Sequence, residues 1–370
     1  MKKIALLFDR TYIDAHHCFR ELAVQLAEMG FGVDLYALSN SFNFQPFFEN
    51  TNIRLLEFPR SKFQKLEYWS KIFYSMDRRY EAIIATPILG TWLAYRTAKS
   101  QKIPYYYFAD ELLEQILANS PAGERNKLKR RNYLSNKRAA ATIALGEERW
   151  IVQKQLNGIN YLQDHFIIPN APSGIPKRLK SNFFRDLFNI EDRKPILLFA
   201  GTLNWILAKK VYEETKSFGE KDYHIVFHAR TLGLMGEENH PFIKISKMPI
   251  PAGMMNFAVS SADIGLALYD KDSKPETDNA LTGGKIGTYL KNELPLIAGS
   301  SENLRIFEEE QLGIYWDGKT PFDQIAQVAI KNREIFRPYI RGYYSMHLQY
   351  EQFFQKFKEH LLKSIQKNKK

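Results

Sequence analysis

Short apolar runs, each about the length of one β-strand, alternate with amphipathic segments along most of this chain of 370 residues. Strands that are apolar throughout and separated by helices are typical of a parallel sheet covered on both faces. After the first run, the apolar residues from Phe19 to Ala27 recur at the spacing of one face of a helix. This predicted helix ends at Gly30, where a C-cap glycine is expected. The strands expected in the first half are Ile4 to Phe8, Val33 to Leu38, Ile53 to Phe58, Ala82 to Thr86, Ile103 to Phe108 and Ala140 to Ala144.

The pattern restarts in the second half, after Phe166 to Ile168 and the sequence Pro169-Asn170-Ala171-Pro172. The elements expected there are strands at Ile196 to Ala200, His224 to Ala229, Ile264 to Leu268, Leu296 to Ala298 and Gly313 to Tyr315, and helices near Leu207 to Phe218, Gly253 to Ser260 and Gly284 to Lys291. Two such series predict an α/β protein with two doubly wound, Rossmann-like domains that face a cleft. We expect domains at residues 1–175 and 176–345. From Pro321 onward the chain is expected to be helical throughout, and residues 346–370 to form a helix that returns to the N-terminal domain.

Length and composition exclude several other classes of protein. The length suits two domains of ordinary size. No apolar run reaches the roughly 18 residues that a membrane-spanning helix needs, and Ile196 to Ala208 is interrupted by Asn204. The N-terminal sequence MKKIALLFDR is interpreted as a strand and not as a signal peptide, because its short apolar stretch runs into Asp9. The single cysteine, Cys18, excludes an intramolecular disulfide and a cysteine-cluster metal site. We therefore expect a cytoplasmic protein.

The net charge of +11 and the pI near 9.3 point to an anionic partner. By charge alone, nucleic acid, anionic lipid and a nucleotide diphosphate all qualify. Nucleic acid is not expected, because the basic residues are not interleaved with a recognisable binding module.

Two segments of the N-terminal half are cationic. Apolar and aromatic residues from Phe63 to Tyr80 lie near helical spacing with lysines and arginines beside them, and Glu124 to Arg138 is rich in both basic residues. A basic amphipathic helix beside a second cationic segment is what a peripheral enzyme presents to anionic lipid. We expect docking at the inner face of the membrane. The alternative is that the apolar residues between Phe63 and Tyr80 pack on the sheet of their own domain, and that the charges only keep the protein in solution.

The sequence Thr282-Gly283-Gly284-Lys285 leads directly into an expected helix. Backbone without side chains lets a ligand approach closely, and the helix N-terminus offers N–H groups to a phosphate. Lys285 adds a positive charge. The alternative is an ordinary tight turn with a solvated lysine. The sequence is not a P-loop, because Ile286 stands where a Ser or Thr would hold magnesium.

Several stretches, in their order and spacing, resemble GT-B glycosyltransferases, in particular the family-4-like enzymes (glycosyltransferase group 1) of bacterial polysaccharide synthesis. The matching stretches are IIPNAP, ILLFAGTLN, MPIPAGMMNFAVSSADIGLALY, GGKIGTYLKNELPLIAGS, YYYFADELLEQ and KRAAATIALGEERW. The resemblance spans nearly the whole chain. It implies an acceptor-binding N-terminal domain and a nucleotide-sugar-binding C-terminal domain. It also implies transfer of a hexose-type sugar, with retention, to a saccharide or lipid-linked saccharide.

The resemblance further implies a donor site built from basic residues and a helix N-terminus, with no metal ion and no other cofactor. The expected donor-binding residues are Thr202, Lys209, Lys210, Arg230, Gly283, Gly284, Lys285 and Thr288. Each of the lysines has the alternative of being a solvated surface charge. The two glutamates of the family are absent, since Thr288 and Ala280 stand at their positions. Thr288, Glu276 and Asp278 are the candidates to replace them.

Asp110 and Glu111 follow the expected strand Ile103 to Phe108, at the carboxyl edge where open α/β sheets bind ligands. One of these carboxylates is expected to orient or deprotonate the acceptor hydroxyl. The alternative is that Asp110 caps a helix whose first turn contains Glu111. His16, beside His17, follows the first strand, where the family has a Gly-rich loop near the reacting sugar. A catalytic role for His16 stands against a capping or surface role.

Two other functions stay open. Nucleotide-sugar epimerases of the 2-epimerase kind share the expected architecture and convert the donor without an acceptor. A catalytically degenerate GT-B protein would bind a nucleotide sugar or glycan as a sensor or assembly partner, and the missing glutamates favour it. A nicotinamide oxidoreductase is disfavoured, because no GxGxxG sequence follows the first strand.

Overall fold

The computed structural model describes residues 1–8, 17–38, 52–58, 80–112, 117, 120–156, 163–201, 206–217, 219–229, 240–248, 250–269 and 280–367. The chain forms two compact units. Unit 1 consists of Met1–Asn170 and Tyr350–Lys370, and unit 2 of Ala171–Gln349. The chain therefore passes between the units twice, after Asn170 and after Gln349. The sequence analysis expected these crossings near residues 175 and 346.

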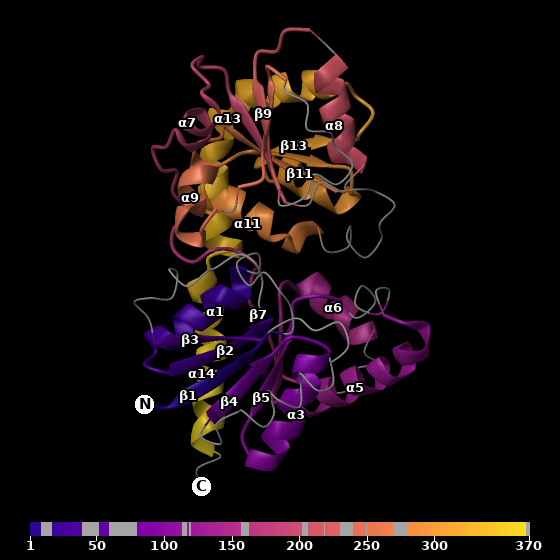
Figure 1. Cartoon of the computed structure of the whole chain (residues 1–370), viewed down its shortest axis with the longest axis vertical. Coiled ribbons are helices and arrows are strands. Elements are labelled where there is room, and N and C mark those ends of the chain that lie inside the picture. Colours follow the sequence, from indigo (N-terminus) through magenta and orange to yellow (C-terminus); the bar gives the residue numbers. More distant parts are fainter. Residues whose placement is uncertain are drawn as a thin grey trace. The chain divides into compact units, whose positions relative to one another are not determined.

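Unit 1 is built on a parallel sheet of seven strands in the order β3-β2-β1-β4-β5-β6-β7 (Figure 1). The chain adds β2 and β3 on one side of β1 and then returns to add β4 on the other, so the winding reverses at β1. The strands are β1 Lys3–Leu7, β2 Gly32–Leu38, β3 Ile53–Phe58, β4 Tyr80–Ala85, β5 Tyr105–Ala109, β6 Ala141–Ala144 and β7 His165–Ile167.

Helices cover both faces of this sheet, which accounts for strands that are apolar on both sides. Ile4 and Leu6 contribute to a core shared with α1 and α14, whereas Leu7 faces the core formed with α3. The helix α5 packs beside α3. The helical elements of unit 1 are α1 His17–Glu28, α3 Leu89–Gln101, η3 Ala122–Glu124, α5 Arg125–Arg138, α6 Glu147–Leu156 and α14 Tyr350–Lys367.

The last helix, α14, completes the core of unit 1. Its Phe357 is fully buried, and the ring meets the Tyr106 ring edge-on with 5.1 Å between centroids. The Tyr350 hydroxyl donates a hydrogen bond of 3.0 Å to the carbonyl oxygen of Cys18, a residue 332 positions away. Figure 1 places α14 beside the strands β1 and β2. The N-terminal half of the chain therefore depends on its last segment for one face of its sheet.

Unit 2 has a parallel sheet of six strands in the order β10-β9-β8-β11-β12-β13, and its winding reverses at β8. The helix α8 lies on one face, and α9 and α11 lie on the other. The strands are β8 Ile196–Ala200, β9 His224–His228, β10 Ile243–Ser246, β11 Ile264–Leu268, β12 Leu296–Gly299 and β13 Gly313–Trp316. The helical elements are α7 Phe183–Phe188, α8 Ile206–Ser217, α9 Ala252–Ser260, η4 Ala280–Thr282, α11 Gly284–Lys291, η5 Glu302–Arg305, α12 Ile306–Glu309 and α13 Phe322–His347.

The helix α13 passes from one face of this sheet to the other. Phe322, at its start, belongs to the core on the α8 side, whereas Phe336 and Tyr344 belong to the core on the α11 side. The Tyr344 hydroxyl also donates a hydrogen bond to the carbonyl oxygen of Pro172, in the segment where the chain enters unit 2. One long helix therefore joins both faces of the sheet to the entry segment.

The predicted fold class, an α/β protein with two doubly wound parallel sheets, is confirmed. The strands predicted by residue range and the helices predicted near Leu207, Gly253 and Gly284 lie within one or two residues of their expected ends, whereas the helix expected from residue 346 begins at Tyr350. The prediction did not include β10, whose sequence Ile-Lys-Ile-Ser is only four residues long. No helix in the described part of the chain has both the length and the apolarity needed to cross a membrane.

One prediction of local structure was wrong. Tyr80 was grouped with apolar residues at helical spacing, but it is the first residue of the strand β4. Its hydroxyl donates a 2.6 Å hydrogen bond to buried Asp34. The rest of that predicted segment, residues 59–79, lies outside the described residues. The terminal segment, expected to be helical from Pro321 with a further helix from residue 346, consists of α13 and α14, and Leu348 and Gln349 lie between them. The break is needed because α13 packs in unit 2 and α14 packs in unit 1.

We predict that Phe357→Ala lowers the free energy of unfolding of unit 1 by about 3–5 kcal/mol, because it leaves a cavity where a buried ring packs on Tyr106. Leu362→Ala on the same helix is the control. Leu362 is 37% exposed, so its loss is expected to cost about 1 kcal/mol or less. Hydrogen exchange resolved by peptide measures the effect, as faster exchange in β1 and α1. Equal exchange in the two variants would contradict this role of α14.

Candidate functional site

The carboxyl ends of β8 and β11 form the reversal point of the unit 2 sheet. These strands are neighbours, yet β8 leads into α8 on one face and β11 leads towards α11 on the other. Open α/β sheets bind ligands in the crevice outside the carboxyl ends of the strands at such a point. The residues there are the first candidates for a ligand site in unit 2.

Lys285, in the first turn of α11, reaches this reversal point. Its Nζ atom is buried and lies 4.3 Å from the centroid of the Tyr269 ring, just after β11, and 4.5 Å from that of Phe199, in β8. Phe199 belongs to the core on the α8 side, whereas α11 packs on the opposite face. The Lys285 side chain therefore extends past the strand ends from one face towards the other. The faces of the two aromatic rings attract its ammonium group.

Gly201 keeps the backbone beside Lys285 free of a side chain. It follows β8 with a φ of +137°, and its N–H donates a 3.0 Å hydrogen bond to the carbonyl oxygen of His228. A residue with a side chain would be strained at this φ. Its Cβ would also lie 3.9 Å from Lys285 Nζ. Glycine thus leaves room for a ligand to approach both the backbone and the cation.

Tyr289 holds α11 against β8. Its ring is fully buried, and its hydroxyl accepts a 2.7 Å hydrogen bond from the Ala200 N–H and donates one of 3.0 Å to the Leu198 carbonyl oxygen. Gly265 in β11 makes room for the ring, because a Cβ there would lie 2.5 Å from Tyr289 Cδ2. Tyr289 is one turn after Lys285, so these contacts fix the point from which the lysine side chain leaves its helix.

The other predicted residues of this helix occupy its first two turns. Gly283 is the N-cap in an extended conformation, and Gly284 is the first helical residue. Buried Thr288 donates its hydroxyl hydrogen to the Gly284 carbonyl oxygen at 2.8 Å. Such bonds within a helix are common for threonine. In this bond the Thr288 hydroxyl donates its proton to the backbone of α11.

Lys209 and Lys210, on α8, lie in different surroundings. Lys209 is exposed. Lys210 Nζ donates a 2.5 Å hydrogen bond to the Gly318 carbonyl oxygen and lies 3.5 Å from Glu214 Oε1. Glu214 in turn accepts a 2.8 Å hydrogen bond from the N–H of Phe322 at the start of α13. Lys210 therefore links α8 to the chain after β13.

Three predicted site residues, His16, Thr202 and Arg230, lie outside the described residues, as do Glu276 and Asp278. Within the described ranges, no three His, Cys, Asp or Glu side chains are grouped so that they could hold a metal ion.

In unit 1, Asp110 lies at the carboxyl end of β5 and is only 5% exposed. Its carbonyl oxygen accepts a hydrogen bond from Arg149 Nη2 of α6, and Arg149 is also 5% exposed. Cys18, in the first turn of α1, is within electrostatic range of both. Burial and the charge of Asp110 raise the pKa of the Cys18 thiol, while Arg149 acts to lower it. The sheet edge thus brings a buried carboxylate and a buried guanidinium together.

More charged residues lie at the start of α1 and beside Asp110. Arg20 Nη2 lies 3.1 Å from Glu21 Oε1, both side chains are buried, and so is His17. Glu111 is half-buried. Buried charges are costly unless they are paired, and such groups are concentrated at functional sites. This charged cluster is the candidate acceptor side of the protein.

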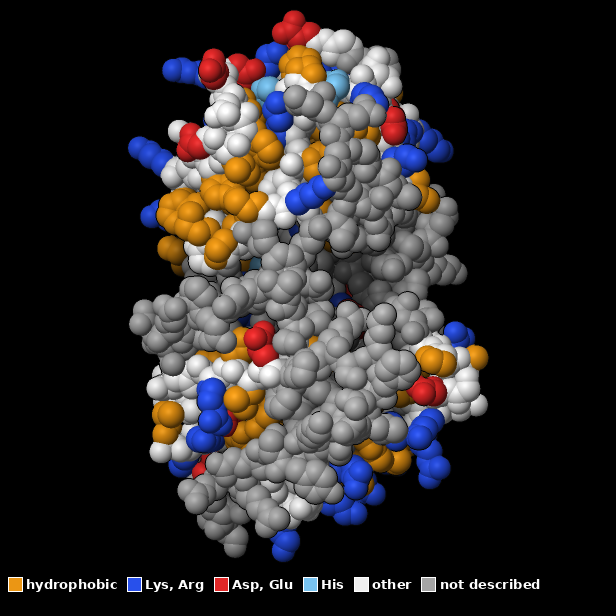
Figure 2. All heavy atoms as spheres, viewed as in Figure 1, with side chains coloured by type: hydrophobic (Ala, Val, Ile, Leu, Met, Phe, Trp, Pro, Cys, Tyr) orange, Lys and Arg blue, Asp and Glu red, His pale blue; other side chains and the backbone are white. Residues whose placement is uncertain are grey.

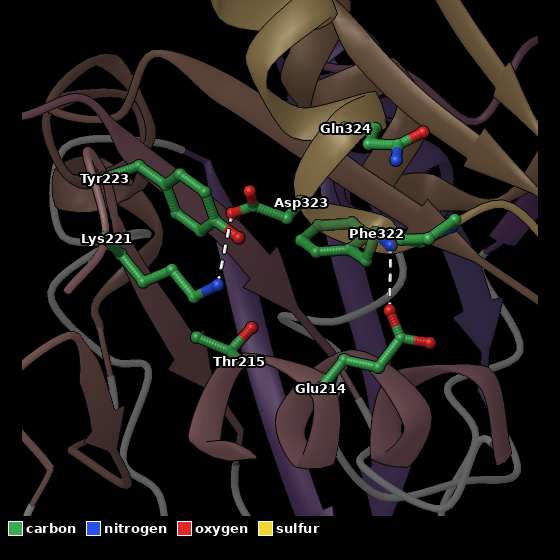
Figure 3. A pocket seen from close by; sticks show the side chains of 8 residues that line it. Glu214, Thr215, Lys221, Tyr223, Phe322, Asp323 and Gln324 are labelled. Atoms are coloured by element: carbon green, nitrogen blue, oxygen red, sulfur yellow. Dashed lines mark hydrogen bonds and ion pairs between the residues drawn. The ribbon is translucent and has the colours of Figure 1, made fainter. Parts of the chain in front are cut away.

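A separate cavity of about 300 Å³ lies between α8 and the start of α13 (Figure 3). Lys221 and Tyr223, which immediately precede β9, line it together with Thr215 of α8. Lys221 Nζ lies 3.2 Å from Asp323 Oδ1 at its wall. Because Lys221 and Tyr223 come before the strand, this cavity lies toward the amino ends of the sheet. It is not part of the crevice at β8 and β11.

Two groups of site residues escaped the sequence analysis. Phe199 resembles any other apolar residue of a buried strand, and Tyr269 simply follows one. Only the neighbouring positions of β8 and β11 bring them around Lys285. Arg149 is 39 positions from Asp110 and carries no local pattern. No sequence pattern indicated these contacts, because they arise from the order of the strands in the sheet and not from spacing along the chain.

We predict that Tyr289→Phe destabilises unit 2 by about 1–2 kcal/mol, because it leaves the half-buried Ala200 N–H and the buried Leu198 carbonyl oxygen without this partner. Tyr315→Phe is the matched control. Its hydroxyl donates a 2.9 Å hydrogen bond to Ser300 at a half-buried position, where water can replace it. Thermal unfolding of the two variants gives the comparison. A loss for Tyr289→Phe no larger than for Tyr315→Phe would rule out the anchoring role.

No protein-family model and no curated protein matches the sequence. Solved structures match the fold over nearly the whole chain. HepE of Anabaena, solved with UDP-glucose, is 12% identical with a TM-score of 0.68, over 98% of this chain and 100% of that one. Sucrose-phosphate synthase of Thermosynechococcus elongatus is 12% identical with a TM-score of 0.64, over 96% and 99%. A glycosyltransferase of Rickettsia africae is 12% identical with a TM-score of 0.63, over 97% and 99%. Likeness at these identities shows the fold alone, and the chain has the GT-B fold.

Proposed function

We propose that the protein is a glycosyltransferase that moves a sugar from a nucleoside diphosphate to an acceptor hydroxyl. The bond between the anomeric carbon and the β-phosphate oxygen breaks, and a bond from that carbon to the acceptor oxygen forms. The hydroxyl proton passes to a base, and the nucleoside diphosphate leaves. Unit 2 binds the donor, and unit 1 binds the acceptor.

The observation that carries this proposal is the position of Lys285. Its buried ammonium lies beside Gly201 at the reversal point of the sheet, in the first turn of a helix. A cation and a helix N-terminus at one point suit a diphosphate, since both favour negative charge. The solved structures support the same ligand class, because HepE, with the same fold, has been solved with UDP and with UDP-glucose.

Lys285 stabilises the leaving diphosphate. Negative charge grows on this group as the glycosidic bond breaks, and a cation already fixed in a water-poor site stabilises it without further reorganisation. The rings of Tyr269 and Phe199 hold the ammonium before the donor arrives, and so offset part of its desolvation cost. We propose that this charge takes the place of a metal ion, and that transfer is metal-independent.

On the acceptor side, we assign proton removal to the carboxylates after β5. Asp110 and Glu111 are both candidates for the general base. Arg149 holds the Asp110 backbone through its carbonyl oxygen. The acceptor is a saccharide or lipid-linked saccharide of cell-surface polysaccharide synthesis, and the sugar keeps its anomeric configuration. These finer assignments are supported by the sequence resemblance.

The donor site is tested by Lys285→Met, which keeps the aliphatic stem between the two rings but removes the charge. We expect UDP and UDP-glucose to raise the melting temperature of the wild-type protein, with about 2.7 kcal/mol of stabilisation at one hundred times the Kd. The variant is expected to bind roughly ten- to hundredfold more weakly, since a hydrogen bond to a charged group contributes about 1.5–3 kcal/mol. Lys216→Met, on an exposed lysine of α8, is the control and keeps the wild-type shift.

The same experiment separates the alternatives. If no nucleotide changes the melting temperature at millimolar concentration, the donor site is refuted. Conversion of a sugar nucleotide without any acceptor would indicate an epimerase. Binding that Lys285→Met abolishes, with no turnover of donor on any acceptor, would indicate a binding protein. The last outcome has one structural observation in its favour, namely that the Thr288 hydroxyl already donates within its own helix.

We further propose that unit 1 meets an anionic membrane through α5. Arg125, Lys127, Lys129 and Arg130 are exposed on this helix. Arg131 instead lies with its guanidinium 5.8 Å from the Trp92 ring centroid. Figure 2 shows Lys and Arg side chains gathered where α5 lies, at the lower right of the view. A cationic face of this kind attracts anionic lipid headgroups, and it would bring the protein to a lipid-linked acceptor.

We expect reversal of three of these charges, Lys127, Lys129 and Arg130 to Glu, to weaken binding to phosphatidylglycerol-containing vesicles at least about hundredfold, at about 1 kcal/mol for each basic residue. A variant with Lys356, Lys363 and Lys367 changed to Glu on α14 carries the same change of net charge and is the control. Cosedimentation with vesicles measures both. Equal losses would show that only net charge matters and would refute docking through α5.

A further inference from the structure

The cavity of about 300 Å³ between α8 and the start of α13 has the size of a site for one small molecule. The rings of Tyr223 and Phe322 form part of its wall and meet edge-on, with 6.4 Å between their centroids. Both residues are buried, whereas Pro321 and Gln324, which also line the cavity, are exposed. The cavity therefore has an aromatic inner wall and opens to solvent at the start of α13.

The hydroxyl of Tyr223 is buried in this cavity and makes no hydrogen bond with the described part of the chain. Tyr223 is only 1% exposed, and Figure 3 shows it among Lys221, Asp323 and Phe322. Burial raises the pKa of the hydroxyl, and the charge of Asp323 raises it further, so the group keeps its proton and can donate it. Buried polar groups in proteins nearly always have a partner. An acceptor oxygen of a bound molecule would supply one here.

Two carboxylates supply hydrogen-bond acceptors in the same cavity. Asp323 Oδ1 lies 3.2 Å from Lys221 Nζ, and Asp323 Oδ2 accepts a 3.2 Å hydrogen bond from Gln327. Glu214 Oε2 accepts a 2.8 Å hydrogen bond from the N–H of Phe322. A carboxylate has about four lone-pair sites, so each of the two can also accept a hydrogen bond from a ligand. One cavity thus offers a donor and several acceptors.

The charged side chains that line the cavity are paired with opposite charges. Lys221, whose side chain is 5% exposed, is paired with Asp323. Glu214 is paired with Lys210, at 3.5 Å between Oε1 and Nζ. An anionic ligand would meet the two carboxylates, and a cationic ligand would meet buried Lys221. Repulsion between like charges is strong where water is excluded, so the cavity favours a neutral ligand.

We propose that this cavity is a binding site for one neutral sugar ring. The hydroxyls of a sugar both donate and accept hydrogen bonds, which suits the Tyr223 hydroxyl and the two carboxylates together. Its C–H groups form an apolar face that packs on the rings of Tyr223 and Phe322. The cavity lies toward the amino ends of the sheet. The site is therefore distinct from the crevice at β8 and β11, and it does not rest on the proposed donor site.

Saturation-transfer NMR of the full chain with glucose, galactose, mannose and N-acetylglucosamine tests the proposal. A ligand with so few atoms binds with a Kd on the order of a millimolar, and at least one of the four sugars receives saturation from the protein. Gln324→Trp abolishes this transfer, because the indole fills the mouth of the cavity. Ile335→Trp, at an exposed residue about three turns further along α13, is the matched control and keeps it. Equal melting temperatures verify that both variants are folded.

Tyr223→Phe separates a role in binding from a role in the fold. Loss of one hydrogen bond to the sugar raises its Kd about three- to tenfold. The melting temperature of the protein without sugar does not fall, because the substitution removes no hydrogen bond within the described part of the chain. A lower melting temperature would assign the hydroxyl to the fold and would overturn its role in binding.

Three further outcomes would overturn the proposal. The first is that none of the four sugars receives saturation, as expected if the cavity holds only water. The second is sugar binding that Gln324→Trp leaves intact and Lys285→Met abolishes, which would place the sugar in the crevice at β8 and β11. The third is tighter binding of glucose 6-phosphate than of glucose, which would contradict the preference for a neutral ligand. Failure of UDP to bind would refute the donor site alone, so the two proposals fail separately.

Discussion

The hydroxyl of Tyr289 makes the two hydrogen bonds on which the position of Lys285 in unit 2 depends. By bonding to the backbone at Ala200 and Leu198, it fixes α11 to β8 across the sheet. Gly265 is required in β11 because the ring occupies the space of a side chain. With α11 held there, Lys285, one turn earlier, reaches the ends of both strands. The position of a charge is thus set by a buried neutral group that need not touch a ligand.

The predictable and unpredictable parts of this molecule differ in the range of the interactions behind them. Strands such as Ile264–Leu268 and the helix Gly284–Lys291 follow from local apolar patterns, and their ends were predicted to the residue. The two-unit α/β architecture follows from the repetition of that pattern. The rings around Lys285 and the contact of Arg149 with Asp110 depend instead on which strands become neighbours. A pattern along one segment contains no information about that order.

The excess of basic residues has several structural uses besides ligand binding. Lys291 Nζ donates a 2.5 Å hydrogen bond to the Ile175 carbonyl oxygen and so secures the segment that enters unit 2. Arg178 donates to the carbonyl oxygens of Ser260 and Ala262 at the end of α9. The net charge alone therefore overstates the number of basic side chains that are available to bind a partner. What distinguishes Lys285 is that its ammonium sits on aromatic rings at a strand reversal, and what distinguishes α5 is that its cations are exposed.

The return of α14 to unit 1 has a consequence for the order in which the protein matures on the ribosome. Unit 2, Ala171–Gln349, is complete before the residues of α14 have been synthesised. At roughly 5–20 residues per second, these about 180 residues take some ten to thirty-five seconds to synthesise. During that time the N-terminal sheet has one face without its final covering, although its strands were made first. The half that is synthesised first is the half that is finished last.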